Sequence, residues 1–285
     1  MLLNQTILNE KNLNYPLRHS YQILFLKHII KELEKAGNEE IFDGFYESLT
    51  SLLGSNENEE FSYKHFLRDN DGICITIKEA NSFIRDGTTG LKLWPAAIKL
   101  SEFILSNKSY FKEKSVLELG SGATGFIGMT LLKSTEAHQI FLSDCHDIVL
   151  RNLIENVNLN LDCDKESLET SLLVRQRLKI NNEKDLGILA LPWEEIDEHR
   201  SELKSICTPN VILAADVVYD EAIFDPLLRC LNSLFSDNGK HPLEFILSQT
   251  IRNEDTFHKF RQLLSANSFD ISTMSLDNEN VIFPG

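Results

Sequence analysis

The fold is decided by Ser115-Val116-Leu117-Glu118-Leu119-Gly120-Ser121-Gly122-Ala123-Thr124-Gly125-Phe126-Ile127-Gly128-Met129-Thr130-Leu131-Leu132. Its apolar start predicts a buried strand, its glycines predict a tight turn, and its end predicts a helix. The N–H groups at the start of such a helix stay free to meet a ligand. The G-x-G-x-x-G spacing of Gly120, Gly122 and Gly125 is by itself a weak indication of a nucleotide-like ligand.

The carboxylate of Glu118 narrows the kind of ligand. Glu118 stands two residues before the first glycine, where a dinucleotide-binding fold normally carries an apolar residue that faces a pyrophosphate. A negative charge there repels phosphate, but it suits the cationic amino-acid end of S-adenosyl-L-methionine. We therefore expect a methyl-donor site, with a nicotinamide-dependent oxidoreductase as an alternative from another class.

A second strand, Gln139-Ile140-Phe141-Leu142-Ser143, is predicted to end at Asp144. Asp144 lies 24 residues after Gly120, near the offset at which a doubly wound fold presents an acid to ribose hydroxyls. A ribose diol offers two donors, and a carboxylate supplies paired acceptors. The alternative for Asp144 is an N-cap for the helix predicted from His146 to about Leu159.

Two further strands are predicted to place candidate site residues at the same edge of the sheet. The strand at 188–191 leads to Trp193, which either flanks a purine by stacking or belongs to the core. The strand at 210–216 ends in Asp216, with Tyr219 close behind. Open α/β sheets bind ligands at the carboxyl ends of their strands, so we expect Asp216 and Tyr219 to take part in a site.

The rest of the chain completes the architecture. Helical spacing of apolar residues over 19–35 and 41–53 predicts a helical hairpin, so we assign residues 1–60 to an N-terminal helical extension and 61–285 to one domain. Alternation of strand and helix across 114–267 predicts an α/β fold with a doubly wound, mainly parallel sheet. The other expected elements are a strand at 72–77, a helix from Pro95 through Leu105, a strand at 243–248, a helix at 254–264, terminal strands near 269–275 and 279–283, and an extended or hairpin strand at 172–179.

Composition restricts the partners. A formal net charge of −15 argues against nucleic acid as the main partner, because that binding needs Lys and Arg against phosphates. The five cysteines form no C-x-x-C pair, so we expect a reducing, cytoplasmic location without structural zinc. We also expect no signal peptide and no membrane span.

Taken together, the motifs resemble those of the seven-β-strand protein lysine methyltransferases, and this resemblance implies a Rossmann-like sheet of seven strands. Within them, the chain is most similar to enzymes that methylate a lysine of eukaryotic translation elongation factor 2, a likeness that extends to Pro16-Leu17-Arg18-His19, Phe45-Tyr46-Glu47-Ser48-Leu49, Thr250-Ile251-Arg252-Asn253 and Phe283-Pro284. The motifs of the catalytic domain are Thr88-Thr89-Gly90 with Trp94, Glu118-Leu119-Gly120-Ser121-Gly122, Ser143-Asp144-Cys145-His146, Pro192-Trp193 and Ala214-Ala215-Asp216-Val217-Val218-Tyr219.

This resemblance implies donor contacts from Trp94, Gly120, Ser121, Gly122, Asp144, Trp193 and Ala215. It also implies that the lysine enters at Asp216 and Tyr219, where we expect Asp216 to orient the amine and Tyr219 to shape the channel. The family usually has Gly-x-Gly-x-Gly, whereas Ala123 and Thr124 precede Gly125 here, so we give Gly125 no donor role.

The resemblance also implies the reaction and its participants. S-adenosyl-L-methionine is the expected methyl donor, without a metal, and successive transfers are expected to proceed up to trimethyl-lysine. Elongation factor 2 is the expected protein substrate of a monomeric enzyme. The alternatives are a lysine methyltransferase of the same fold acting on another protein, such as a chaperone, and a binding module that holds the donor without turnover.

Overall fold

A computed structural model gives the fold and describes residues 6–36, 43–55, 60–68, 71–82, 84, 87–161, 171–180, 184–237 and 242–274. The strands are β1 Phe61–Arg68, β2 Ile73–Ala80, β3 Ser115–Leu119, β4 Gln139–Asp144, β5 Val174–Ile180, β6 Lys184–Ala190, β7 Val211–Ala215 and β8 Glu244–Ser248. The helices are α2 Glu10–Asn14, α3 His19–Lys35, α4 Gly44–Gly54, α5 Pro95–Ser106, α6 Phe126–Ser134, α7 Asp147–Leu159, α8 Ile196–Ile206, α9 Phe224–Asp237 and α10 Glu254–Ala266. Short 3-10 turns are η1 Lys108–Phe111, η2 Trp193–Glu195 and η3 Glu221–Ile223.

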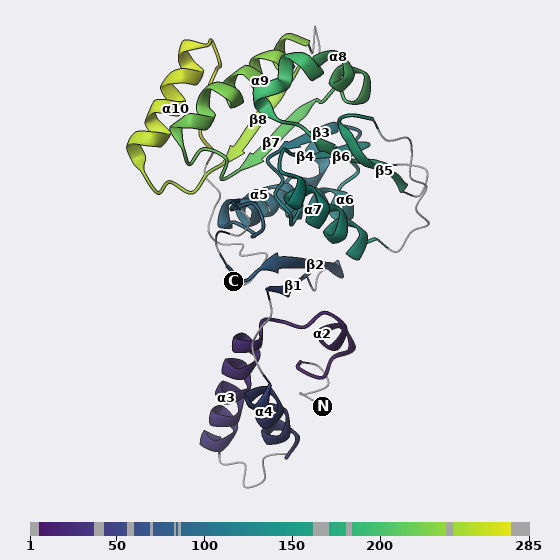
Figure 1. The fold of residues 1–285 in the computed structure, drawn as a ribbon, viewed down its shortest axis with the longest axis vertical. Helices are drawn as coiled ribbons and strands as arrows, with labels where there is room; N and C mark the ends of the chain where they lie inside the picture. Colours follow the sequence, from purple (N-terminus) through teal and green to yellow (C-terminus); the bar gives the residue numbers. More distant parts are fainter. Residues whose placement is uncertain are drawn as a thin grey trace.

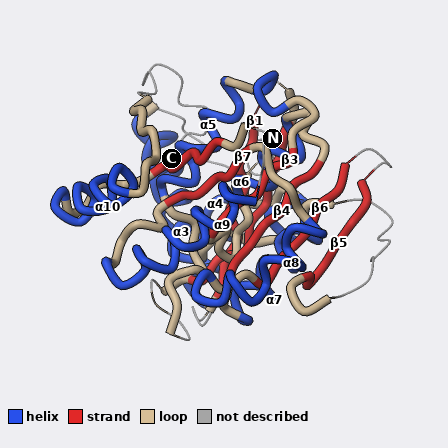
Figure 2. Tube along the Cα trace, turned by 90° about the horizontal axis from the view of Figure 1, so that it is seen from above, coloured by secondary structure: helices blue, strands red, loops and turns tan. Residues whose placement is uncertain are grey.

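One sheet organises the chain, with strand order β5-β6-β4-β3-β7-β8. All neighbours run parallel except β5, which pairs antiparallel with β6. Figure 2 shows these strands side by side, with β5 at one end. In register, Leu119 of β3 lies opposite Ser143 of β4 and Ala214 of β7, so the carboxyl ends of these three strands meet. The predicted α/β fold with a mainly parallel sheet is confirmed.

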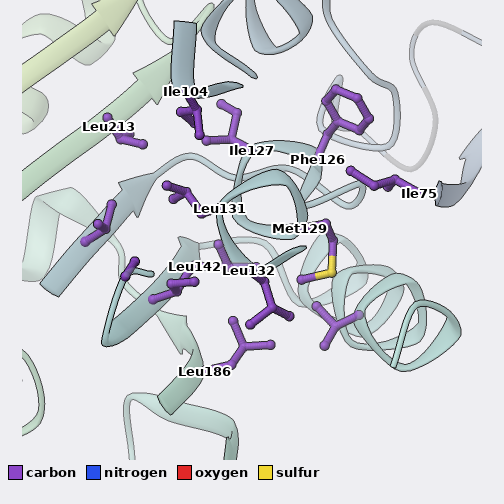
Figure 3. Packing of buried hydrophobic residues seen from close by; sticks show 14 of the residues in the cluster. Ile75, Ile104, Phe126, Ile127, Met129, Leu131, Leu132, Leu142, Leu186 and Leu213 are labelled. Atoms are coloured by element: carbon purple, nitrogen blue, oxygen red, sulfur yellow. The ribbon is translucent and has the colours of Figure 1, made fainter. Parts of the chain in front are cut away.

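Each central strand sends alternate side chains to opposite faces, as the pleat requires. Val116 joins a core formed with α5, α6, α7 and β2, whereas Leu117 joins a second core formed with α8, α9 and α10. Figure 3 shows the first core, in which side chains of α6 lie between Ile75 of β2 and Leu142 of β4. Helices on both faces bury the sheet, which is the arrangement a parallel sheet needs.

The N-terminal helices lie away from the sheet, beyond the β1–β2 ribbon (Figure 1). They share a small cluster of buried residues, Ile7, Leu26, Ile30 and Phe45. Several contacts join this part to β1. Among them, the N–H of Tyr63 donates to the carbonyl of Pro16 at 3.1 Å, Nε2 of His65 lies 2.9 Å from the carbonyl of Tyr15, and the ring centres of Tyr15 and Tyr63 lie 5.3 Å apart. The assignment of residues 1–60 to a separate extension stays a prediction.

Some elements differ from the prediction. Residues 269–274 form no strand, although the alternating Phe269 and Ile271 pack against the second core. The strand expected at 279–283 lies outside the described residues. Six of the seven expected strands form the main sheet among the described residues, and β1 and β2 form a separate two-stranded sheet. Strand β1 and helices α2 and α8 were not predicted. Within the described part of the chain, no helix is both long enough and apolar enough to cross a membrane.

Candidate active site

The loop after β3 lies between two other segments at the carboxyl edge of the sheet. Gly120 and Gly122 have φ values of 66° and 60°, a region that residues with side chains rarely adopt. A Cβ on Gly120 would lie 2.9 Å from Cγ1 of Val217, and one on Gly122 would lie 3.0 Å from the carbonyl oxygen of Gly90. Both positions therefore exclude a side chain and leave the loop backbone bare.

Glu118 lies beneath this loop, on the face of the sheet that carries α6. Its side chain is buried, with the residue 2% exposed, and Oε2 accepts a hydrogen bond from the Gly128 N–H at 3.1 Å. Burial raises the pKa of Glu118 to about 8, against the opposing effect of its hydrogen bonds. The residue is thus an acid that a nearby cation would ionise.

Asp144 lies at the end of β4, beside the glycine loop. Its Oδ2 accepts from the Gly122 N–H at 3.2 Å, and its Oδ1 accepts from the N–H groups of Cys145 at 2.9 Å and His146 at 3.2 Å. Burial raises the pKa of Asp144, while these three N–H groups favour the charged form. The structure therefore brings Asp144 to Gly122, as its spacing from Gly120 suggested.

Ser121 fastens the loop to β4. Its N–H donates to the carbonyl of Ser143 at 2.8 Å, and its hydroxyl accepts from the N–H of Ser143 at 3.0 Å. These bonds give Ser121 a structural task. Its contact with the donor stays a prediction.

Trp193 and Ala215 flank the loop from the neighbouring strands. The half-buried Trp193 ring has two carbons 3.7 and 3.8 Å from the place where a Cβ of Gly120 would be. The N–H of Leu191 donates to the carbonyl of Asp144 at 2.9 Å, which holds the segment before Trp193 against β4. Ala215 is the last residue of β7 and is half-buried at the same edge.

Trp94 approaches the loop from the segment before α5. Its indole N–H donates to the carbonyl of Thr89 at 3.2 Å, and the carbonyl of the next residue, Gly90, accepts from the N–H of Ala123 at 2.7 Å. The guanidinium of Arg252 lies over the Trp94 ring, 4.9 Å from its centre, a cation–π distance. Trp94 therefore joins the glycine loop side of the site to the segment after β8.

Asp216 organises the opposite side of the site. It is buried, has a φ of 54° and follows β7 directly. Oδ1 accepts from the Gln249 side chain at 3.1 Å and the Thr250 N–H at 2.8 Å, and Oδ2 accepts from the Thr250 hydroxyl at 3.1 Å and Arg252 at 3.2 Å. The carboxylate thus accepts four hydrogen bonds from three residues, all in the segment after β8.

Tyr219 is the exposed member of the predicted pair. The residue is 60% exposed. Partial desolvation raises its pKa, and the carboxylates of Asp144 and Asp220 add to the effect, so the phenol stays protonated at neutral pH.

Several residues that complete the site carried no predicted role. Gln249, Thr250 and Arg252 could have been found from their place after β8, because the end of β8 lies beside the end of β7. Gly128 could not, because its importance comes from a tertiary contact with Glu118. Gly125 is the N-cap of α6 with a φ of 52°, and a Cβ on it would lie 2.5 Å from Cδ1 of Leu153, so backbone conformation and packing account for this glycine.

The site combines a bare glycine loop, the buried acids Glu118 and Asp216, the half-buried Asp144, two tryptophans and an exposed tyrosine. These groups can bind an organic cation with a diol and present a second, polar substrate to it. No group of three or more His, Cys, Asp or Glu side chains that could hold a metal ion occurs among the described residues.

Comparison with known proteins identifies a matching family and several similar proteins. A family model described as lysine methyltransferase matches residues 69–266. The protein-lysine N-methyltransferase EEF2KMT of Homo sapiens is 31% identical over 261 residues, which cover 91% of this chain and 74% of that protein. The protein-lysine N-methyltransferase EFM3 of Chaetomium thermophilum is 30% identical over 203 residues, which cover 70% of this chain and 54% of that protein. Among solved structures, a ribosomal protein L11 methylase from Lactobacillus delbrueckii has a TM-score of 0.41 and 15% identity, covering 75% of this chain and 94% of that chain.

Proposed function

The chain belongs to the lysine methyltransferase family and is a methyltransferase, and we propose that it methylates a lysine of translation elongation factor 2 with S-adenosyl-L-methionine as donor. The observation that carries the proposal is the meeting of three strand ends. The glycine loop follows β3, Asp144 ends β4, and Asp216 follows β7, with Tyr219 three residues further along the chain. The names of the relatives support elongation factor 2 as the substrate.

The residues on the glycine-loop side fit such a donor. Gly120 and Gly122 expose backbone to an adenosyl group, and Asp144 offers carboxylate oxygens to a ribose. Trp193 lies against Gly120 and offers a flat apolar surface to a purine. Glu118 gains its charge when an organic cation binds above it. The donor supplies a methyl group on a sulfonium, so the task of the protein is alignment.

On the other side, we propose that Tyr219 meets the incoming lysine and that Asp216 holds the wall beside it. Free lysine has a pKa of about 10.4, so the amine must lose a proton before it can attack. The Tyr219 oxygen can accept a hydrogen bond from the ammonium group and guide it. Asp216 lies beside this path, where its carboxylate is paired with Arg252 and fixes Thr250. A direct contact between Asp216 and the amine stays part of the proposal.

We further propose a monomeric, cytoplasmic enzyme that proceeds up to trimethyl-lysine. Cys74, Cys145, Cys207 and Cys230 are unpaired, as is usual in a reducing compartment.

Mass spectrometry of elongation factor 2 from cells with and without this protein tests the substrate. We expect one methylated lysine to lose its mark in the deleted cells and to regain it with the wild-type gene but not with an Asp144→Ala variant. An unchanged methylation pattern would overturn the assignment to elongation factor 2. Labelled donor added to a lysate of the deleted cells would then reveal the true protein substrate.

A further inference from the structure

A small groove adjoins the acceptor side of the site, and its lining includes none of the residues assigned to the donor. It encloses about 60 Å³ and lies between the segment after β7 and the segment that joins β8 to α10. Its lining residues are Val218, Tyr219, Gln249, Thr250, Ile251, Arg252, Asn253, Thr256 and Phe257. Val217 packs on Gly120, whereas the next residue, Val218, lines the groove. The groove therefore begins one residue from the proposed donor site.

The two sides of the groove carry exposed apolar side chains. Tyr219 is 60% exposed on one side and Ile251 is 54% exposed on the other. Phe257, from the first turns of α10, is half-buried against the second core. Single exposed apolar residues are common on proteins, but two that face one groove beside a reaction site indicate a place where a partner binds.

The rim of the groove is acidic. Asp220 is exposed on the Tyr219 side, and Glu254 and Asp255 are exposed on the first turn of α10. Glu221 pairs with Lys259 at 2.6 Å across the two sides, so this pair adds no net charge. Arg252 is the cation among the lining residues, and Asp216 neutralises it. Negative charge around an apolar depression favours a partner with an apolar side chain in a basic segment.

We propose that this groove binds an apolar side chain that neighbours the target lysine within a basic segment of the protein substrate. The proposal rests on the proposed function, because it assumes that the lysine enters at Tyr219. An apolar neighbour held in the groove would place the lysine beside Asp216 and fix its approach. The groove then selects the sequence around the lysine, while the strand ends bind the donor.

Paired serine variants test the proposal in the full-length enzyme. Ile251→Ser removes the apolar side of the groove, and Leu172→Ser is the control, since Leu172 is 77% exposed just before β5 at the opposite end of the sheet. We expect Ile251→Ser to raise the KM for the protein substrate about tenfold or more. The kcat and the affinity for the donor should stay within about twofold of the wild type, and Leu172→Ser should leave all three unchanged.

Charge gives a second readout. Glu254→Lys with Asp255→Lys should raise the same KM at low salt and lose this effect at high salt, because exposed charges are screened. Equal KM values for Ile251→Ser and the wild type would overturn the proposal that the groove binds the protein substrate. Failure of the wild type to methylate elongation factor 2 would overturn only the proposed substrate. The KM of Ile251→Ser and of the wild type would then be compared on the protein that the labelled donor identifies in the lysate.

Discussion

At the scale of single residues, Glu118 couples the glycine loop to the helix that follows it. Its carboxyl group lies inside the protein, bonded to the N–H of Gly128. A buried acid of this kind is neutral in the folded chain at a pH where it would be charged in water. It can therefore change charge with pH or with the arrival of a cation.

Replacement of Glu118 should change how stability depends on pH. The unfolded chain releases this proton near the ordinary pKa of 4.5, whereas the folded chain keeps it until about pH 8. Between these values the folded state binds more protons, so the free energy of unfolding falls as pH rises, by up to about 1.4 kcal/mol per pH unit. Glu118→Gln should remove that fall. In thermal unfolding without donor, the Tm of Glu118→Gln relative to the wild type should thus rise as the pH increases from 5 to 8.

The exposed Glu198 on α8 supplies the control for this prediction. Glu198→Gln should follow the wild type at every pH. Parallel melting curves for wild type and Glu118→Gln would show that the buried carboxyl group does not govern this pH dependence.

Gly128 should tolerate no side chain. A Cβ there would lie 2.1 Å from Cδ2 of Leu142, which is fully buried. Alanine favours a helix by about 1 kcal/mol over glycine, but overpacking a core costs about 1–3 kcal/mol. We expect Gly128→Ala to destabilise the protein in urea unfolding. The cost should shrink in a Leu142→Ala background, and strictly additive effects would contradict direct contact.

At the scale of elements, the segment after β8 holds the site together. It supplies Thr250 and Arg252 to Asp216 after β7, and it places Arg252 over Trp94 before α5. Three segments distant in sequence are thereby fixed to one another. The acceptor side of the site depends on this junction as much as on the strands themselves.

Removal of Arg252 should loosen this junction, and the emission of Trp94 should report it. The chain has two tryptophans, so a Trp193→Phe background isolates Trp94. We expect Arg252→Ala to shift the emission to longer wavelength and to cost about 1 kcal/mol of stability, a small value because the Arg252 side chain is half-exposed. Arg252→Lys should keep part of the effect. An unchanged emission spectrum in Arg252→Ala would show that Arg252 does not influence the surroundings of Trp94 in solution.

The elements differ in how well sequence reveals them. Strand β3 and the loop after it were predictable, because an apolar run and glycines with required geometry encode them locally. Helix α3 was predicted with the bounds that the structure gives, His19–Lys35. Strand β1 was not predicted, because its strand structure depends on its pairing with β2 and not on the local sequence alone. The place of Thr250 and Arg252 after β8 could have suggested that they belong to the site, but the individual bonds that they make to Asp216 depend on tertiary geometry that the sequence does not encode locally.

At the scale of the whole molecule, the hydrophobic residues fall into separate clusters. Two large clusters cover the faces of the sheet, and the small cluster around Leu26 belongs to the N-terminal helices. No residue is shared between the small cluster and the large ones. Damage to the N-terminal helices should therefore leave the donor side of the site intact.

Leu26→Ala tests this separation. Leu26 is fully buried, and such a truncation costs about 2–5 kcal/mol locally. Hydrogen exchange should speed up in α3 and α4 but not in β3, β4 or β7, and the affinity for the donor should stay the same. A weaker donor affinity would show that the N-terminal helices support the site after all.

Strand β5 closes one end of the sheet, and its composition bears on colloidal behaviour. A terminal strand can recruit a strand from another molecule and seed aggregates. The exposed positions of β5 carry Arg175 and Lys179, whose charges repel a second copy of the same strand. Replacement of both by valine should leave the fold intact yet lower the concentration at which light scattering begins. These cations thus protect the protein from self-association at high concentration.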